Sequence, residues 1–208
     1  MIRIGLTGGI AVGKSTATAY LRQIGYHVID ADDVSRAVVQ KGMPALAAIQ
    51  AYFGSNILME NGELNRPELA RRIFSSEKER EALNAIMFPA IWKEVDRQLK
   101  AYERRYPAEK IVFVDAAVLL ESGGKPFVDC VWLVNCDEAL QIQRLMERNH
   151  LNQEEAEQRM KAQWPFEKKA AMADKILENN EKPQMLFQQI CDALKEIHES
   201  RSNPKART

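Results

Sequence analysis

The chain has 208 residues, 46% of them hydrophobic and 28% charged, which suits one folded domain with a sizeable core. Its 29 basic residues balance its 29 acidic ones, so no net charge favours nucleic acid or an anionic membrane as a partner. The three cysteines are scattered, no signal peptide precedes the first apolar run, and no apolar run approaches the ~20 residues that span a bilayer. We therefore expect a cytoplasmic protein without a disulfide framework.

Strand and helix patterns alternate along the chain, which predicts an α/β fold with a mainly parallel sheet. Apolar runs predict strands at residues 2–7, 27–30, 110–115, 130–135 and 175–177. Helical periodicity predicts helices at residues 15–24, 45–53, 67–74, 77–106 with an interruption at Pro89, 137–148, 153–163 and 183–199. The polar tail, residues 200–208, is expected to fray.

A phosphate-binding loop follows the first predicted strand, because residues 8–15 read GGIAVGKS. Gly8 and Gly13 let the backbone turn its N–H groups toward an anion, and the next helix adds the positive end of its dipole. Lys14 can reach the terminal phosphates, and the hydroxyl of Ser15 can bind Mg²⁺. The loop therefore predicts a nucleoside triphosphate site with Mg²⁺ as the cofactor.

Carboxylates follow the next two strands of the predicted sheet. Asp30 ends the second predicted strand and Asp32 and Asp33 follow it, while Asp115 ends the third. Ligands collect at the carboxyl ends of parallel strands, so all of these side chains are expected to face the nucleotide. Asp115 is placed as a carboxylate on the Mg²⁺ side would be. Asp33 or Asp30 can instead cap the following helix, so Asp32 is the carboxylate that we expect to take a proton from an acceptor hydroxyl.

About eighty residues separate the second and third predicted strands, whereas a crossover needs only about a dozen. Their helical periodicity predicts an inserted helical lobe for the acceptor, with purely architectural decoration as the alternative. Further along, Arg144 and Arg148 lie four apart and share one face of a helix. They belong either to a solvated surface or to a mobile lid whose arginines close over transferring phosphates.

Together these segments resemble the dephospho-CoA kinase family over roughly residues 1–200, in order and in spacing. The loop alone does not select a substrate, so the match becomes specific through VIDAD (28–32) and ADKILEN (173–179). The other matching segments are 5–16, Phe53-Gly54, LNR (64–66), Ile73-Phe74, LNAIMFP (83–89), 115–121 and 141–148.

The resemblance implies a P-loop, three-layer kinase domain over residues 1–205, and we expect this domain to be a monomer. Its parts would be a core of residues 1–57, 111–147 and 166–200, a helical substrate lobe of residues 58–108, and a helical lid of residues 148–165. The implied reaction transfers the γ-phosphate of ATP to the ribose 3′-hydroxyl of dephospho-CoA, which gives coenzyme A and ADP in the last step of coenzyme A synthesis.

The resemblance also implies a role for each matching residue. Asp32 would be the general base and an acceptor-binding residue, Lys14 and Arg144 would stabilise the transferred phosphoryl group, and Arg148 would assist from the lid. Arg66 would bind the acceptor, while Ser15 and Asp115 would hold Mg²⁺. The ATP phosphates would be bound by six consecutive residues: Ala11, Val12, Gly13, Lys14, Ser15 and Thr16.

The chain departs from the common family pattern at a few positions. Ala11 and Val12 replace Gly-Ser, a change that backbone binding of phosphate tolerates if the side chains point away. Phe88 replaces a frequent His and removes a polar group from the lobe, and Asn65 replaces a frequent Asp.

Three other functions are compatible with a phosphate-binding loop. A kinase for another small molecule is the nearest, and a panel of acceptors would separate it. A GTPase-like switch would carry D-x-x-G after the third strand and N-K-x-D later, and the chain has neither. An ATPase acting on nucleic acid would need a basic groove interleaved with aromatic residues, which the sequence does not show.

Overall fold

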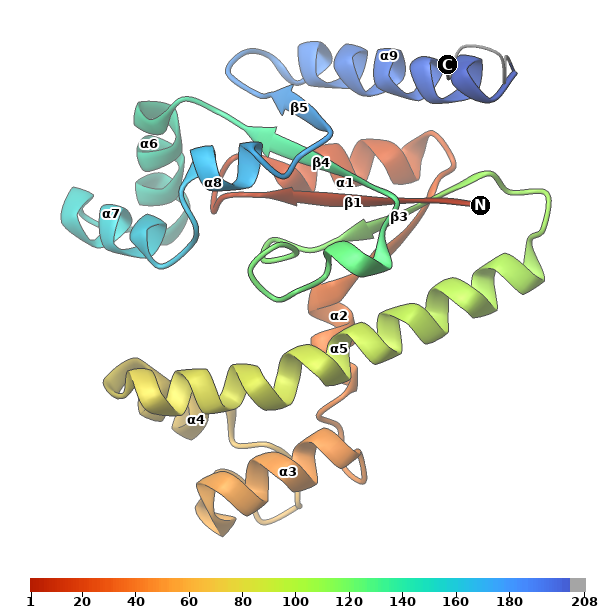
Figure 1. The fold of residues 1–208 in the computed structure, drawn as a ribbon. Helices are drawn as coiled ribbons and strands as arrows, with labels where there is room; N and C mark the ends of the chain where they lie inside the picture. Colours follow the sequence, from red (N-terminus) through yellow and green to blue (C-terminus); the bar gives the residue numbers. More distant parts are fainter. Residues whose placement is uncertain (203–208) are drawn as a thin grey trace.

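The computed structural model describes residues 1–202, the last three as backbone only. Within this range one parallel sheet has the order β2-β3-β1-β4-β5 (Figure 1). Its strands match the predicted ones to within one residue, and the predicted α/β class is confirmed. The strands are β1 (Ile2–Gly8), β2 (His27–Asp30), β3 (Ile111–Asp115), β4 (Cys130–Asn135) and β5 (Lys175–Glu178).

Both faces of the sheet are covered, which makes the molecule three-layered. Along β3, Ile111 and Phe113 pack in one core with α1 (Lys14–Gln23) and α9 (Pro183–Ser202). The alternate residues Val112 and Val114 pack in a second core, with helices of the long insertion. Strands buried on both faces read as continuous apolar runs, which is why β3 could be recognised from the sequence.

The insertion between β2 and β3 is helical, as predicted. Figure 1 shows α3 and α4 beside α5, away from the sheet. The same apolar core joins these helices to the sheet, so the insertion has no separate core. The boundary of a substrate lobe at residue 58 stays a prediction. The helices are α2 (Ala31–Ala37), α3 (Pro44–Phe53), α4 (Arg66–Ser75) and α5 (Glu77–Arg105).

The predicted interruption at Pro89 is wrong, because α5 is one helix that includes this proline. A proline inside a helix removes one hydrogen bond and costs about 3 kcal/mol. Tertiary packing offsets this cost, since Trp92, Val95 and Leu99 are buried on the following turns. The indole N–H of Trp92 also donates to the carbonyl oxygen of Ser122 at 3.0 Å, which ties α5 to the loop after β3.

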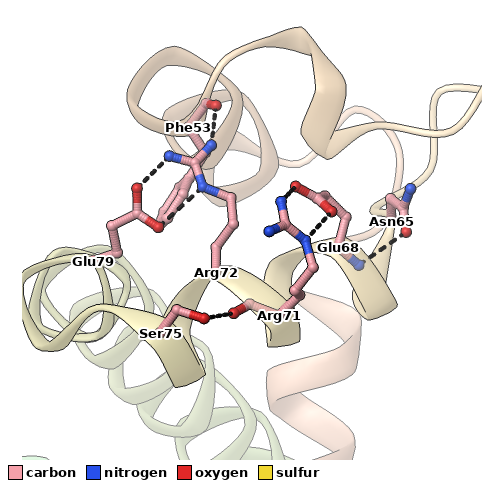
Figure 2. Close-up of polar contacts among 7 residues, drawn as sticks. All are labelled: Phe53, Asn65, Glu68, Arg71, Arg72, Ser75 and Glu79. Atoms are coloured by element: carbon pink, nitrogen blue, oxygen red, sulfur yellow. Dashed lines mark hydrogen bonds and ion pairs between the residues drawn. The ribbon is translucent and has the colours of Figure 1, made fainter.

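Arg72 joins three helices of the insertion, as Figure 2 shows. Its guanidinium on α4 forms an ion pair with Glu79 on α5 and donates to the carbonyl oxygen of Phe53, the last residue of α3, at 2.6 Å. The same group lies 4.9 Å from the centroid of the Phe53 ring. Arg72 therefore fixes the end of α3 against the start of α5.

Glu79→Gln is expected to lower the melting temperature at neutral pH. The hydrogen-bonded Arg72 guanidinium lowers the pKa of Glu79 from its usual value. A carboxylate with a depressed folded-state pKa stabilises the fold above its unfolded-state pKa, and that stabilisation is lost as the pH falls through the folded-state value. The difference between variant and wild type should therefore disappear in acid. Thermal unfolding from about pH 7 to about pH 3 measures this; a difference that is constant over the range contradicts it.

Three short helices follow β4 and lie beyond the end of β1 in Figure 1. They are α6 (Glu138–Asn149), α7 (Gln153–Lys161) and α8 (Phe166–Ala170). Single 3-10 turns occur at Ser55–Ile57 and Lys125–Phe127. Among the described helices, none has the length and apolar character to cross a membrane. The helix α9 extends to Ser202, three residues beyond the predicted end, and the rest of the tail that we expect to fray lies outside the described residues.

Candidate functional site

The phosphate-binding loop connects β1 to α1, as predicted, and α1 begins at Lys14. Its backbone is left-handed at two positions, with φ of 61° at Ala11 and 90° at Gly13. Glycine adopts this conformation freely, whereas it costs an alanine about 1 kcal/mol. Val12 is 2% exposed and packs in the core, so its side chain leaves the anion-binding side of the loop to the backbone.

Asn179 fixes the loop from the end of β5, a role that the sequence did not reveal. Its Nδ2 donates to the carbonyl oxygen of Val12 at 2.8 Å, and its side chain is buried. A Cβ atom at position 13 would overlap this side chain, so Gly13 is needed for space as well as for conformation. The only signal was the position of Asn179 just after the apolar residues of the ADKILEN segment.

Asp115 lies at the base of the loop, where β3 ends. Its Oδ1 accepts from Nζ of Lys14, and its Oδ2 accepts from Oγ1 of Thr18 at 2.6 Å. The Asp115 side chain is almost fully buried, so this ion pair is shielded from water. The structure therefore brings together two of the predicted residues, Lys14 and Asp115, and adds Thr18, which lies one helical turn after Lys14.

The three aspartates at the end of β2 and just after it have different surroundings. Asp30 caps α2 and accepts from the backbone N–H of Asp32 at 2.8 Å, which confirms the capping alternative for Asp30. Asp33 forms an ion pair with Arg36 at 3.0 Å. The carboxylate of Asp32 is exposed and has no hydrogen-bond or ion-pair partner among the described residues. Asp30 is also opposite Asp115 in the last pair of the β2–β3 register, so Asp32 lies two residues beyond the end of β2.

The arginines of α6 differ from each other, although they share a helix. Nη1 of Arg144 is buried without a hydrogen-bond partner in the described structure. It lies 3.9 Å from the position that a Cβ atom would occupy at residue 13. Its guanidinium also borders Cys136, where burial raises the pKa of the thiol and the arginine opposes that shift. Arg148 is exposed and donates to the side chain of Asn149 at 3.0 Å. Of these two arginines, Arg144 is therefore the one that reaches the phosphate loop.

A buried ion pair lies under the segment that follows α7. Nζ of Lys169, which is 1% exposed, is 2.7 Å from Oε1 of Glu121. The same oxygen accepts from the backbone N–H of Trp164 at 3.4 Å. This pair ties the loop after β3 to the carboxyl end of the predicted lid. Glu121 was part of the family pattern, but no pattern singled out Lys169.

Arg66 lies apart from the phosphate loop, at the start of α4. It borders a cavity of about 590 Å³, and no residue of the phosphate loop lines that cavity. The cavity combines cationic side chains with an apolar wall and one carboxylate. Its lining residues are Arg36, Val39, Gln40, Lys41, Met59, Glu63, Leu64, Arg66 and Pro67.

Comparison with known proteins assigns this arrangement to a family. A family model described as dephospho-CoA kinase matches residues 2–184. The chain is 44% identical over 199 residues to a dephospho-CoA kinase of Shouchella clausii, and the match covers 95% of this chain and 100% of that protein. The chain belongs to the dephospho-CoA kinase family. It is therefore an ATP-dependent kinase, that is, a transferase. A dephospho-CoA kinase of Geobacillus kaustophilus is 43% identical, with 94% of this chain and 96% of that protein covered.

Solved structures agree with the fold of a dephospho-CoA kinase. The protein TT1252 from Thermus thermophilus is 29% identical and superposes with a TM-score of 0.73, over 94% of this chain and 96% of its own. A dephospho-CoA kinase from Campylobacter jejuni gives a TM-score of 0.72 at 24% identity, over 96% of this chain and 98% of its own. A shikimate kinase from Acinetobacter baumannii gives 0.52 at 16% identity, over 94% of each chain. The last two likenesses concern the fold alone.

Proposed function

We propose that this chain transfers the γ-phosphoryl group of ATP to the ribose 3′-hydroxyl of dephospho-CoA, which gives coenzyme A and ADP as the last step of coenzyme A synthesis. The observation that carries the proposal is the buried Nη1 of Arg144 beside the phosphate loop, which has no hydrogen-bond partner within residues 1–202. A buried cationic donor without a partner is costly, so this position favours an anionic ligand at the loop.

For ATP, we assign the phosphates to the backbone and side chains of residues 11–16. Lys14 is held by Asp115 in this structure, and it would move its charge onto the β- and γ-phosphates when they bind. Mg²⁺, when bound, would neutralise charge on the same phosphates. The exposed hydroxyl of Ser15 and the Oδ1 of Asp115 that Lys14 releases are oxygen donors of the type that Mg²⁺ prefers, so these residues fit the ion.

For the acceptor, we assign the general base to Asp32, whose carboxylate has no other partner among the residues that the structure describes. Arg36 lies one helical turn later on α2, so it shares a face with Asp32. In dephospho-CoA the diphosphate is attached to C5′ of the ribose whose 3′-hydroxyl reacts. The base and the cation that binds the diphosphate must therefore be about as far apart as the 3′-hydroxyl and the diphosphate are on that ribose. Arg36 also lines the cavity of about 590 Å³ that Arg66 borders. Three cationic side chains line this cavity, with one carboxylate, that of Glu63.

The remaining expectations belong to the same proposal. We propose that the enzyme acts as a cytoplasmic monomer on ATP and dephospho-CoA, without nucleic acid or a membrane as partner. Residues 148–165 form the lid in this scheme, residues 58–108 the acceptor lobe, and Arg148 an auxiliary lid cation. The balanced formal charge supports the absence of a nucleic-acid role.

The test is direct. The purified chain is incubated with ATP, Mg²⁺ and dephospho-CoA, and ADP and coenzyme A are measured by chromatography. Equal amounts of the two products are expected, and Lys14→Ala, checked for folding by circular dichroism, should give almost none. A panel of nucleosides, nucleotides and sugars tests the alternative acceptors. Phosphorylation of one of these in preference to dephospho-CoA would overturn the proposal.

Arg66→Ala is expected to raise KM for dephospho-CoA about 10- to 100-fold, because hydrogen bonds to charged groups contribute about 1.5–3 kcal/mol. KM for ATP should stay unchanged, since Arg66 lines a cavity apart from the phosphate loop. Initial rates with each substrate varied in turn measure both constants. Arg80→Ala is the control, because exposed Arg80 pairs with Glu77 one turn back on the surface of α5. An unchanged KM for dephospho-CoA in Arg66→Ala would remove Arg66 from the acceptor site.

A further inference from the structure

Two glutamine side chains hold both backbone polar groups of Ile10, the residue directly before the proposed ATP-binding residues. The N–H of Ile10 donates to Oε1 of Gln163 at 2.7 Å, and its carbonyl oxygen accepts from Nε2 of Gln141 at 2.6 Å. Gln141 lies on α6, before the proposed lid, and Gln163 follows α7, near the end of the lid. One residue of the loop thus contacts both sides of the lid segment.

The local structure is fitted to this arrangement. A Cβ atom at position 9 would lie 2.8 Å from Nε2 of Gln141, so Gly9 makes room for the glutamine. Ile10 is half-buried and β1 ends at Gly8, so the sheet no longer supplies partners for the backbone N–H and carbonyl groups of this residue. A glutamine amide carries both an acceptor and donors, and each of the two side chains offers Ile10 the complementary group.

Close packing does not replace these hydrogen bonds. A cavity of about 500 Å³ separates the loop from the lid segment on this side, and it is lined by Gly9, Val12, Trp164 and both glutamines, among others. Side chains do not fill this space, and the two hydrogen bonds are direct contacts between the loop and the residues on either side of the lid segment.

We propose that Gln141 and Gln163 are positioning residues. They hold the phosphate loop in its ATP-binding conformation and fix its position relative to the lid. The inference rests on the proposed function only in taking residues 11–16 as the ATP site. The glutamines act through Ile10 and need not touch ATP. Loss of either glutamine gives the loop more conformational freedom. Part of the binding free energy of ATP is then used to order the loop, and the affinity falls.

The experiment replaces each glutamine with methionine, which has a similar length and no amide. ATP binding is measured by calorimetry with Mg²⁺, and kinetic constants are measured with each substrate varied. Gln163→Met and Gln141→Met are expected to weaken ATP binding about tenfold, as the loss of one such hydrogen bond predicts. KM for dephospho-CoA at saturating ATP should stay within about twofold of the wild-type value, and the melting temperature should stay close to it.

Matched controls come from the same helices. Gln143 and Gln153 are exposed, and each donates to a glutamate one turn along its own helix at 2.9 Å. Their methionine variants should bind ATP as the wild type does. The double variant at 141 and 163 should also bind ATP more weakly than the wild type. Its loss of affinity should be much smaller than the product of the two single losses, because both glutamines act on one residue. Strictly multiplicative effects, or a weakening that the controls share, would overturn the proposal.

Amide exchange gives a test that needs no nucleotide. The Ile10 N–H should exchange slowly in the wild type and in Gln163→Glu, which keeps an acceptor oxygen, and rapidly in Gln163→Met. Equal exchange in all three would contradict the proposal, even if a methionine variant were too unstable for kinetics. A wild type that does not bind ATP overturns the proposed function, whereas tight ATP binding by Gln163→Met overturns only the role of the glutamines.

Discussion

Arg144→Ala is expected to reduce kcat about 10³- to 10⁵-fold, the range that arginines on transferring phosphoryl groups contribute elsewhere. The reason is the position of its guanidinium, whose Nη1 is buried beside the loop without a partner in the described structure. Arg144→Lys should also be strongly impaired, because an ammonium group lacks the planar fork that binds two phosphate oxygens at once. Initial rates at saturating ATP and dephospho-CoA measure both variants.

Arg148→Ala provides the comparison on the same helix. Arg148 is exposed and contacts Asn149, so Arg148→Ala should lose much less activity than Arg144→Ala. A folded Arg144→Ala protein that turns over at the wild-type rate would show that Arg144 has only a structural role against Cys136 and Gly13. In that case the lid arginine at the phosphates would be Arg148, and the loss in Arg148→Ala would be the larger.

Asp32→Asn is expected to reduce kcat by about 10²- to 10⁴-fold, as the loss of a general base does. The substitution keeps the size of the side chain but removes the proton acceptor. It does not disturb the cap of α2, because Asp30 makes that cap and Asp32 contributes only its backbone N–H. ATP affinity should therefore change little. Calorimetry with ATP and initial rates with dephospho-CoA separate the two effects.

Asp33→Asn is the matched control, since Asp33 is exposed and pairs with Arg36 one turn along the helix. It should keep most of kcat at saturating acceptor. The opposite outcome, an active Asp32→Asn with an inactive Asp33→Asn, would assign the base to Asp33. If both variants remain active, the aspartates after β2 are structural, and Asp115 becomes the next candidate for the base.

The sequence by itself determined the fold class, the strands and the family. Strands buried on both faces leave continuous apolar runs, and a phosphate loop has fixed spacing, so β1, β3 and the segment from Gly8 to Ser15 could be read locally. The order of Asp32, Arg66 and the later segments then pointed to a dephospho-CoA kinase, which the comparisons bear out at the level of the family.

Only the tertiary structure decided which side chains meet. Asn179, Gln163 and Thr18 support the loop or Asp115, yet a single asparagine, glutamine or threonine carries no local pattern. Arg144 and Arg148 have identical side chains on one helix, and only the docking of α6 on the loop distinguishes them. Pro89 shows the same limit, because the local preference to break a helix was outweighed by burial of side chains on the next turns. Contacts between distant segments depend on how the elements pack, and spacing along the chain does not record that.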